Sequence, residues 1–226
     1  MKLLSTFAAA ATLAAGLMAT SAASASDQTA VLANARSTVE DMKSDQTFGP
    51  SRDLLHRARA VLIIPKLVKA GFIFGGEGGD GVLLARNKSG WSSPAFYTMG
   101  SASFGFQIGI EQAQLVLFIM SDRALRAVER SEFKIGAGAG LTVVTVGASA
   151  EGATSGNLSG DIIVWTSAKG AYGGLTLNGS VIKPREGWNN DFYGRTVTVN
   201  QILANRVKNA DANELRAALS SVRRNR

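Results

Sequence analysis

The sequence contains no cysteine and a single histidine, His56, among its 226 residues. The lack of cysteine excludes disulfide scaffolds, thiolate zinc sites, iron–sulfur clusters and cysteine nucleophiles. One histidine excludes a metal site built from several imidazoles, and a serine–histidine–aspartate centre would depend on His56 alone. Proline is scarce too, with four residues, so the 25 glycines do not belong to a collagen-like repeat.

Glycine is distributed very unevenly along the chain. Twenty-three of the 25 glycines fall between Gly71 and Gly194. Many Val, Ile, Leu and Phe residues accompany them, which excludes a disordered low-complexity tract. We therefore expect one domain over residues 26–226, with a glycine-rich β core at about 60–194 and C-terminal helices within 198–222.

Residues 1–25 have the pattern of a signal peptide. Lys2 supplies the charged start, an apolar stretch follows, and Ala23-Ser24-Ala25 is a cleavage motif. A membrane anchor is the weaker alternative, because a span needs about 20 strongly apolar residues and this segment is mostly alanine. We expect cleavage after Ala25 and export to the periplasm or the medium, either free or peripherally bound to a membrane.

The chain is basic, with a formal net charge of +7, and its cations gather at 56–69 and 195–226. An exported basic protein is not expected to meet nucleic acid, so anionic phospholipid headgroups are the predicted partner, at about 1 kcal/mol per well-placed cation. Ordinary solubilising charge is the alternative. The residues predicted to contact headgroups are Arg57, Arg59, Lys66, Lys69 and Arg86. Lys66 and Lys69 bracket Leu67-Val68, which places charge beside apolar surface.

Helical periodicity and capping residues mark the glycine-poor ends and one internal segment. The predicted helices start at Ser26 or Asp27, at Ser51, at Ser121, after Thr198 and at Asp211. The first helix is expected to end before Gly49-Pro50, and the one after Thr198 is expected to reach Arg206.

Short apolar and alternating runs predict strands through the glycine-rich middle. They lie at 60–65, 71–74, 82–86, 95–98, 103–110, 115–120, 141–148, 162–166 and 171–177. Pro65 is expected to end the first strand, and Gly75–Gly81 (GGEGGDG) is expected to form a hairpin turn. The fold class is therefore α+β, with a curved antiparallel, barrel-like β-sheet core, helices at both ends and one internal helix.

Three glycine motifs have functional and structural interpretations. Gly76–Gly81 matches a dinucleotide-binding pattern, but a strand follows it where a helix is required. Gly75–Leu83 matches one copy of a calcium repeat that needs stacked copies, so Glu77 and Asp80 are either weak calcium ligands or solvated turn residues, the second being favoured. Residues 135–140 alternate glycine with small residues, which indicates a tightly packed strand rather than a membrane helix contact.

No catalytic constellation emerges, and we expect neither an enzyme nor a cofactor nor a metal. Candidate nucleophiles and acids are present but unpaired in the sequence, namely Ser93, Ser101, Ser103, Glu111, Asp122, Glu151 and Asp161. Two aromatic groups, 91–97 and 188–193, suit either a membrane–water boundary or the packed end of a curved sheet.

A series of short motifs in a fixed order resembles the SYLF domain family, which is also called the lipid-binding or yeast actin-binding SYLF family. In the first half these are Ile64-Pro65, Lys69–Phe72, Gly75-Gly76, Gly81-Val82, Gly90–Ser92, Pro94–Phe96, Gly105–Gly109 and Leu115–Leu117. In the second half they are Ala168–Gly170, Gly173, Leu175, Gly179–Val181 and Asp191–Gly194. The resemblance covers roughly residues 28–205.

This resemblance implies a phospholipid-binding module that is not an enzyme, as an exported bacterial member of the family. Eukaryotic relatives bind phosphoinositides and fungal ones also bind actin. The alternatives are a self-associating structural protein of the bacterial envelope, and a factor that meets actin or another host protein. The sequence leaves the lipid, the oligomeric state and the calcium question open.

Overall fold

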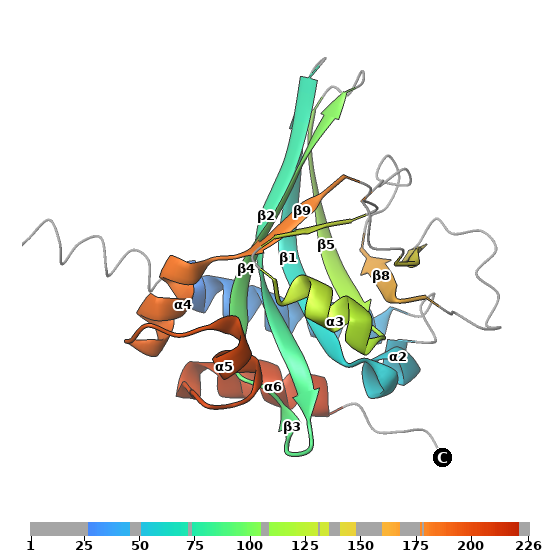
Figure 1. Cartoon of the computed structure of the whole chain (residues 1–226). Helices are drawn as coiled ribbons and strands as arrows, with labels where there is room; N and C mark the ends of the chain where they lie inside the picture. The colour runs from blue at the N-terminus through green and yellow to red at the C-terminus, as the bar shows by residue number, and fades with distance from the viewer. Residues whose placement is uncertain are drawn as a thin grey trace, which may run out of the picture.

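The computed structural model describes residues 27–45, 51–71, 74–104, 109–130, 132–135, 141–147, 160–167, 177 and 179–221. The predicted signal peptide lies outside these residues. A nine-stranded, mainly antiparallel sheet forms the centre of the molecule (Figure 1). The strands follow the spatial order β6-β9-β4-β2-β1-β5-β8-β7, with β3 paired to β2 beside this path.

The strands are as follows: β1 Ala60–Gly71, β2 Phe74–Asn87, β3 Gly90–Trp91, β4 Ala95–Phe104, β5 Gly109–Ile119, β6 Phe133–Lys134, β7 Val143–Gly147, β8 Ile162–Thr166 and β9 Val181–Pro184. All pairings are antiparallel except that of β7 with β8, which is parallel. The predicted α+β class with a curved antiparallel core is confirmed.

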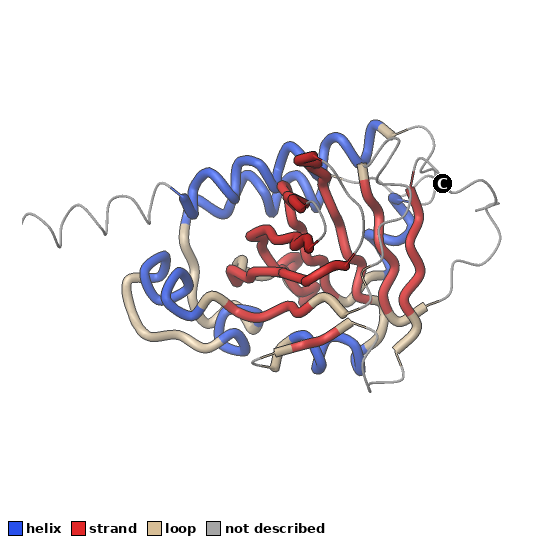
Figure 2. Tube along the Cα trace, turned by 90° about the horizontal axis from the view of Figure 1, so that it is seen from above, coloured by secondary structure: helices blue, strands red, loops and turns tan. Residues whose placement is uncertain are grey.

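Helices cover both faces of the sheet. They comprise an N-terminal helix at 27–44, α2 Ser51–Arg57, α3 Asp122–Val128, α4 Glu186–Tyr193, α5 Val199–Leu203, the short 3₁₀ helix η2 Ala210–Ala212 and α6 Asn213–Ser220. Seen from above, the N-terminal helix lies along one side of the strands and α3 along the other (Figure 2). Each face has its own apolar core, so successive residues of β1 alternate between them: Leu62 packs on the α3 side, and Val61 and Ile63 on the side of the N-terminal helix.

Two of the predicted caps are confirmed and one is wrong. Ser121 Oγ accepts a hydrogen bond from the Ala124 N–H, and Thr198 forms a capping box with Gln201. The Asp211 side chain does not cap a helix. Instead Asn209 Oδ1 accepts from the Asp211 N–H at the start of η2, and α6 follows directly. The helix after Thr198 is also shorter than predicted, because Asn205 has a φ of 58°, a left-handed conformation that ends a helix.

Pro65 does not end the first strand, contrary to the prediction. Ile64 pairs with Leu115 and Leu67 with Ala113, so Pro65 and Lys66 together face the single residue between them on β5. This is a β-bulge, where proline is tolerated because no ladder hydrogen bond is required from its nitrogen. The strand bends there and continues to Gly71.

The prediction of a hairpin turn at Gly75–Gly81 is wrong as well. The whole segment lies inside β2 and is paired with β1 on one side and with β4 on the other. A β-carbon on Gly79 would collide with the carbonyl oxygen of Lys66, and one on Gly81 with that of Ile63. Glycine thus allows β2 to approach the bulged part of β1 closely, which is a packing role rather than a turn.

Two predicted strands span junctions. Residues 71–74 contain the end of β1 and the start of β2, and residues 103–110 contain the end of β4 and the start of β5. The predicted strand at 171–177 lies outside the described residues except for Leu177, and most of 135–140 also does. The short strands β6 and β9 were not predicted, because runs of two to four residues carry little periodicity.

Candidate functional site: a basic face around α3

The five predicted headgroup residues do not form one patch. Arg57 ends α2, and Arg59 lies just before β1, with its Nε 3.2 Å from Asp122 Oδ1. Lys66 and Lys69 lie in the second half of β1, about 20 Å further along at roughly 3.3 Å per residue. These four residues therefore form two separate groups, and which of them contacts a headgroup stays a prediction.

Arg86 is exposed, but its side chain contacts the end of α2 and the ring of Trp91. Its Nε donates to the Ala58 carbonyl at 3.3 Å, its Nη2 donates to the Leu55 carbonyl, and its guanidinium carbon lies 4.2 Å from the centre of the Trp91 ring. Burial lowers the pKa of this guanidinium. These contacts fasten the end of α2 to β2 and use two of the five N–H donors of Arg86.

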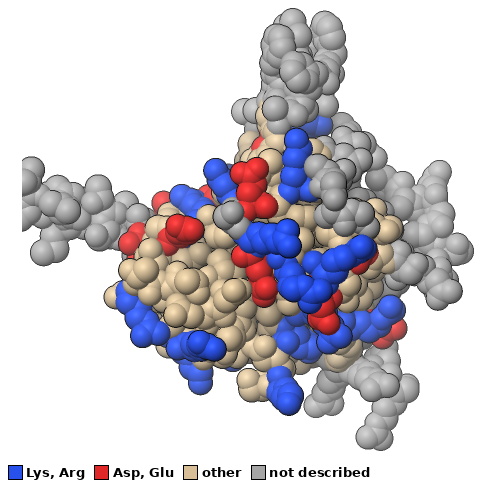
Figure 3. Space-filling model, viewed as in Figure 1, with Lys and Arg blue, Asp and Glu red and all other residues tan. Residues whose placement is uncertain are grey.

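The structure shows a larger basic surface on the α3 side of the sheet (Figure 3). We call the basic face the exposed cations on α3, in the turn after it and on the paired strands β6 and β9, together with Arg59, which is ion-paired to α3. They are Arg59, Arg123, Arg126, Arg130, Lys134 and Lys183. Arg126, Arg130, Lys134 and Lys183 make no ion pair with the described residues. β6 pairs with β9, which places Lys134 and Lys183 on neighbouring strands beside α3.

Only Arg59 of the basic face was among the predicted contacts. The rest come from α3, the turn after it, β6 and β9, and no local sequence pattern connects these segments. One signal was nevertheless available, since Arg123, Arg126 and Arg130 recur at spacings of three and four, which places them on one side of a helix.

Asp161 holds the start of α3 in place. Its carboxylate accepts hydrogen bonds from Ser121 Oγ at 2.6 Å, from Arg123 Nη2 at 2.8 Å and from the Thr142 N–H at 3.1 Å. The bond from Ser121 is the main cause of the lowered pKa of Asp161, and those from Thr142 and Arg123 add to it. Because Ser121 is also the cap of the helix, one carboxylate bonds to the cap, to the first helical cation and to the residue just before β7.

The other end of α3 is anchored to the sheet. The Tyr97 hydroxyl in β4 donates to the Val128 carbonyl at 3.0 Å. Burial raises the pKa of Tyr97, and the nearby Glu129 carboxylate raises it further. Burial also raises the pKa of Glu129, which Arg126 partly opposes. The basic face is therefore presented by a helix that is fixed at both ends.

The candidate catalytic residues have structural roles or lie apart. Ser93 Oγ donates to the Val207 carbonyl and Ser101 Oγ donates to Glu77, both at 2.8 Å. His56 is exposed on α2. Asp122 and Asp161 are engaged by arginines. Ser103 and Glu111 lie in β4 and β5, and Glu151 lies outside the described residues.

Glu77 and Asp80 do not converge on one ion. They are three residues apart in a regularly paired stretch of β2, so they point to opposite faces of the sheet. Asp80 Oδ2 instead lies 2.7 Å from Arg185 Nη1. Within the described residues, no group of three or more His, Asp or Glu side chains is placed to hold a metal ion.

The aromatic groups belong to the interior, as in the packing alternative. Phe96 meets Trp188 and Phe192 edge to face, with ring centres 5.9 and 5.0 Å apart. Trp91 and Tyr97 are buried. None of the helices that the structure describes has the length and apolar character needed to span a bilayer.

Comparisons with known proteins identify the family of this domain. The model of the Ysc84 family, described as "Las17-binding protein actin regulator", matches residues 100–222. "Protein YSC84" of Saccharomyces cerevisiae is 35% identical over 175 residues, which cover 74% of this chain and 37% of that protein. "LAS seventeen-binding protein 3" of Saccharomyces cerevisiae is 33% identical over 175 residues, covering 74% and 38%.

A mammalian relative gives a similar alignment. "SH3 domain-containing YSC84-like protein 1" of Rattus norvegicus is 31% identical over 163 residues, which cover 71% of this chain and 48% of that protein. The chain thus spans less than half the length of each of these three relatives. No solved structure gives a significant match.

Proposed function

Since the chain belongs to the Ysc84, or SYLF, family, we propose that it is a non-catalytic binding module that attaches to anionic phospholipid surfaces through the basic face. The observation that supports this most is the concentration of exposed cations around α3 (Figure 3). Four of them are free of ion pairs with the described residues, so their charge is available to a partner.

Electrostatics alone gives such a face a useful affinity. Each Lys or Arg near an anionic bilayer contributes about 1 kcal/mol, so four cations suffice for reversible attachment at low salt. The attraction falls off within a Debye length of about 10 Å at 0.1 M salt, so binding must weaken as salt is added.

Vesicle co-sedimentation tests the proposal. Anionic vesicles should pellet the protein, neutral vesicles should not, and raising the salt concentration should release it. The variant R126Q/R130Q/K183Q removes three cations of the basic face and should weaken binding about a hundredfold. Equal binding to neutral and anionic vesicles, insensitive to salt, would overturn the proposal.

A matched control separates the position of the charge from its amount. Lys88, Arg206 and Lys208 are exposed cations near the β2–β3 turn and the end of α5, away from α3. The variant K88Q/R206Q/K208Q has the same net charge as the first variant. It should keep most of the vesicle binding. Equal loss in both variants would show that only net charge matters.

A second candidate function is binding to a protein of the actin machinery. The family description and the printed name of "LAS seventeen-binding protein 3" favour it. Co-sedimentation with actin filaments checks it directly, with the same two triple variants. If the protein pellets with filaments and R126Q/R130Q/K183Q does not, the basic face is the filament-binding surface. If the unmodified protein does not pellet with filaments, this candidate function is removed.

We also propose that residues 1–25 direct export of the chain, on the sequence pattern given above. In a host with a general secretory pathway, N-terminal sequencing of the mature protein should begin at Ser26. Replacing Ala23 and Ala25 by arginine should leave the full-length precursor in the cell. A mature product that still begins at Met1 would contradict the proposal.

A further inference from the structure

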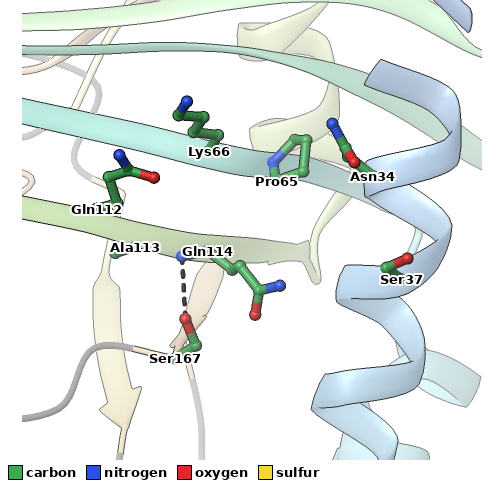
Figure 4. A pocket seen from close by; sticks show the side chains of 8 residues that line it. All are labelled: Asn34, Ser37, Pro65, Lys66, Gln112, Ala113, Gln114 and Ser167. Atoms are coloured by element: carbon green, nitrogen blue, oxygen red, sulfur yellow. Dashed lines mark hydrogen bonds between the residues drawn. The ribbon is translucent and has the colours of Figure 1, made fainter. Parts of the chain in front are cut away.

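A polar pocket lies on the face of the sheet opposite the basic face (Figure 4). It has a volume of about 310 Å³ and is bounded by the N-terminal helix, the bulge of β1, the middle of β5 and the residue after β8. Its polar side chains are Asn34, Ser37, Lys66, Gln112, Gln114 and Ser167. None of these residues belongs to the basic face.

The bulge in β1 is what brings Lys66 to this pocket. Ile64 and Leu67 both pack in the core on the α3 side, although they are three residues apart. The two residues between them are therefore both turned to the other face, toward the N-terminal helix. In a regular strand, successive side chains alternate and Lys66 would face the α3 core. Bulges elsewhere re-aim side chains in this way beside binding sites.

Four of the six polar side chains have no partner within the described residues. Asn34, Ser37, Lys66 and Gln112 make neither a hydrogen bond nor an ion pair there through their side chains. They come from three different segments and all line the same pocket. Among the described residues that line the pocket, Lys66 is the one charged side chain, and the Asp41 carboxylate lies behind Gln114.

The other two polar side chains are fixed by the protein. Gln114 Nε2 donates to Asp41 Oδ2 at 2.8 Å, and Ser167 Oγ accepts from the Gln114 N–H at 3.0 Å. The Gln114 carboxamide is thereby oriented from the N-terminal helix and still offers its carbonyl oxygen as an acceptor. The pocket thus combines a preset acceptor with free donors and acceptors around one cation.

We propose that this pocket binds a small phosphorylated polyol. The ammonium group of Lys66 would contact the phosphate, and the carboxamides, which both donate and accept, would contact hydroxyl groups. A volume near the lower end of the range for ligand pockets admits a ligand of glycerol phosphate or hexose phosphate size. Two sources carry this chemistry, a free metabolite and the headgroup of a glycerophospholipid.

Titration calorimetry with soluble glycerol 3-phosphate tests the inference on the purified protein. Binding should be saturable, and glycerol and inorganic phosphate should each bind more weakly because each lacks one half of the ligand. K66Q should lower the affinity about tenfold or more, as expected for the loss of a charged hydrogen bond. K88Q removes an exposed lysine outside the pocket and should leave the affinity unchanged.

A second arm distinguishes the two sources of the ligand. Vesicles of phosphatidylglycerol are titrated with the protein and with K66Q, in competition with soluble glycerol 3-phosphate. Saturable soluble binding that depends on Lys66 supports a free metabolite, whereas Lys66-dependent binding seen only with vesicles supports a headgroup. Inorganic phosphate binding as tightly as glycerol 3-phosphate, or K66Q behaving like K88Q in both arms, would overturn the proposal.

Two further readouts keep the result independent of folding and of the proposed function. Lys66 and Gln112 are exposed, so K66Q and Q112L should melt at the temperature of the unmodified protein. Q112L should weaken the binding of glycerol 3-phosphate more than the binding of inorganic phosphate. The variant R126Q/R130Q/K183Q changes the other face. It should retain glycerol 3-phosphate binding even if it no longer binds vesicles.

Discussion

The side chain of Asn189 pairs with the backbone of Phe96 as a neighbouring strand would. Its Oδ1 accepts from the Phe96 N–H at 2.7 Å, and its Nδ2 donates to the Phe96 carbonyl at 3.3 Å. Asn189 is 2% exposed, and β9 ends at Pro184, opposite Tyr97. One carboxamide on α4 therefore extends the pairing along the edge of β4 by one residue after β9 has ended.

Removing this carboxamide should destabilise the protein more than a surface substitution does. N189A leaves the Phe96 N–H buried without a partner, and we expect a loss of about 2–3 kcal/mol in the free energy of unfolding. The Arg185 N–H also donates to the Phe96 carbonyl, at 2.9 Å. N189D keeps the acceptor for the Phe96 N–H but buries a carboxylate beside that carbonyl oxygen, so it should also be destabilised at neutral pH. Denaturant unfolding measures both; a loss below about 0.5 kcal/mol for N189A would contradict the assigned role.

The glycines of β2 differ in what they tolerate. G79A and G81A should each destabilise the protein by about 2 kcal/mol or more, because the new methyl group meets the backbone of β1. G76A and G78A are the matched controls, since their nearest neighbours would lie at 3.5 and 3.6 Å, an ordinary contact distance. Thermal unfolding of the four variants checks this. Similar losses at all four positions would instead indicate a general need for flexibility.

Asp161 should make the stability depend on acid pH. Its pKa is lowered in the folded protein, so its contribution is complete above the unfolded value of about 3.9 and is lost as the pH falls through the lower folded value. D161N should therefore be less stable than the unmodified protein at pH 7, and the gap should close below about pH 4. D191N, at an exposed carboxylate of α4, should show no such closing gap.

Tyr97 and Tyr193 should resist ionisation in the folded state. Burial is the main cause of the raised pKa of both side chains, and the Tyr193 hydroxyl donates to the Pro94 carbonyl at 2.8 Å. Above pH 10 the unfolded chain releases these protons and the folded chain keeps them, so stability should fall as the pH rises. The phenolate absorbance of these two side chains should therefore appear only on unfolding. Y97F and Y193F should each remove one such late-ionising group.

The sequence predicted elements well where local chemistry decides them. The N-terminal helix forms where helical periodicity predicted it, with Ala35, Val39 and Met42 buried and Val31 half-buried. The caps at Ser121 and Thr198 form through contacts within four residues. Prediction from the sequence failed where contacts with a distant segment determine the local structure. GGEGGDG looks like a turn locally, and only the bulge in β1 explains why these glycines lie in the middle of a strand.

The candidate sites show the same limit. A cation is easy to find in a sequence, but whether it is available depends on what lies beside it. Two donors of the exposed Arg86 bond to the Leu55 and Ala58 carbonyls, and its contact with a headgroup stays a prediction. Lys66 was predicted for its charge, yet its surroundings of carboxamides come from the N-terminal helix and β5. No local pattern connects those segments.

The order of strands in the sheet has a consequence for how the chain reaches its fold. The contact between Phe96 and Asn189 joins residues 93 positions apart, and the hydrogen bond from Trp165 Nε1 to Asp45 joins residues 120 apart. Loops of this length must close before such contacts stabilise anything, and proteins dominated by distant pairings fold slowly. A newly made chain of this kind therefore stays unfolded for longer than one whose contacts are mostly local.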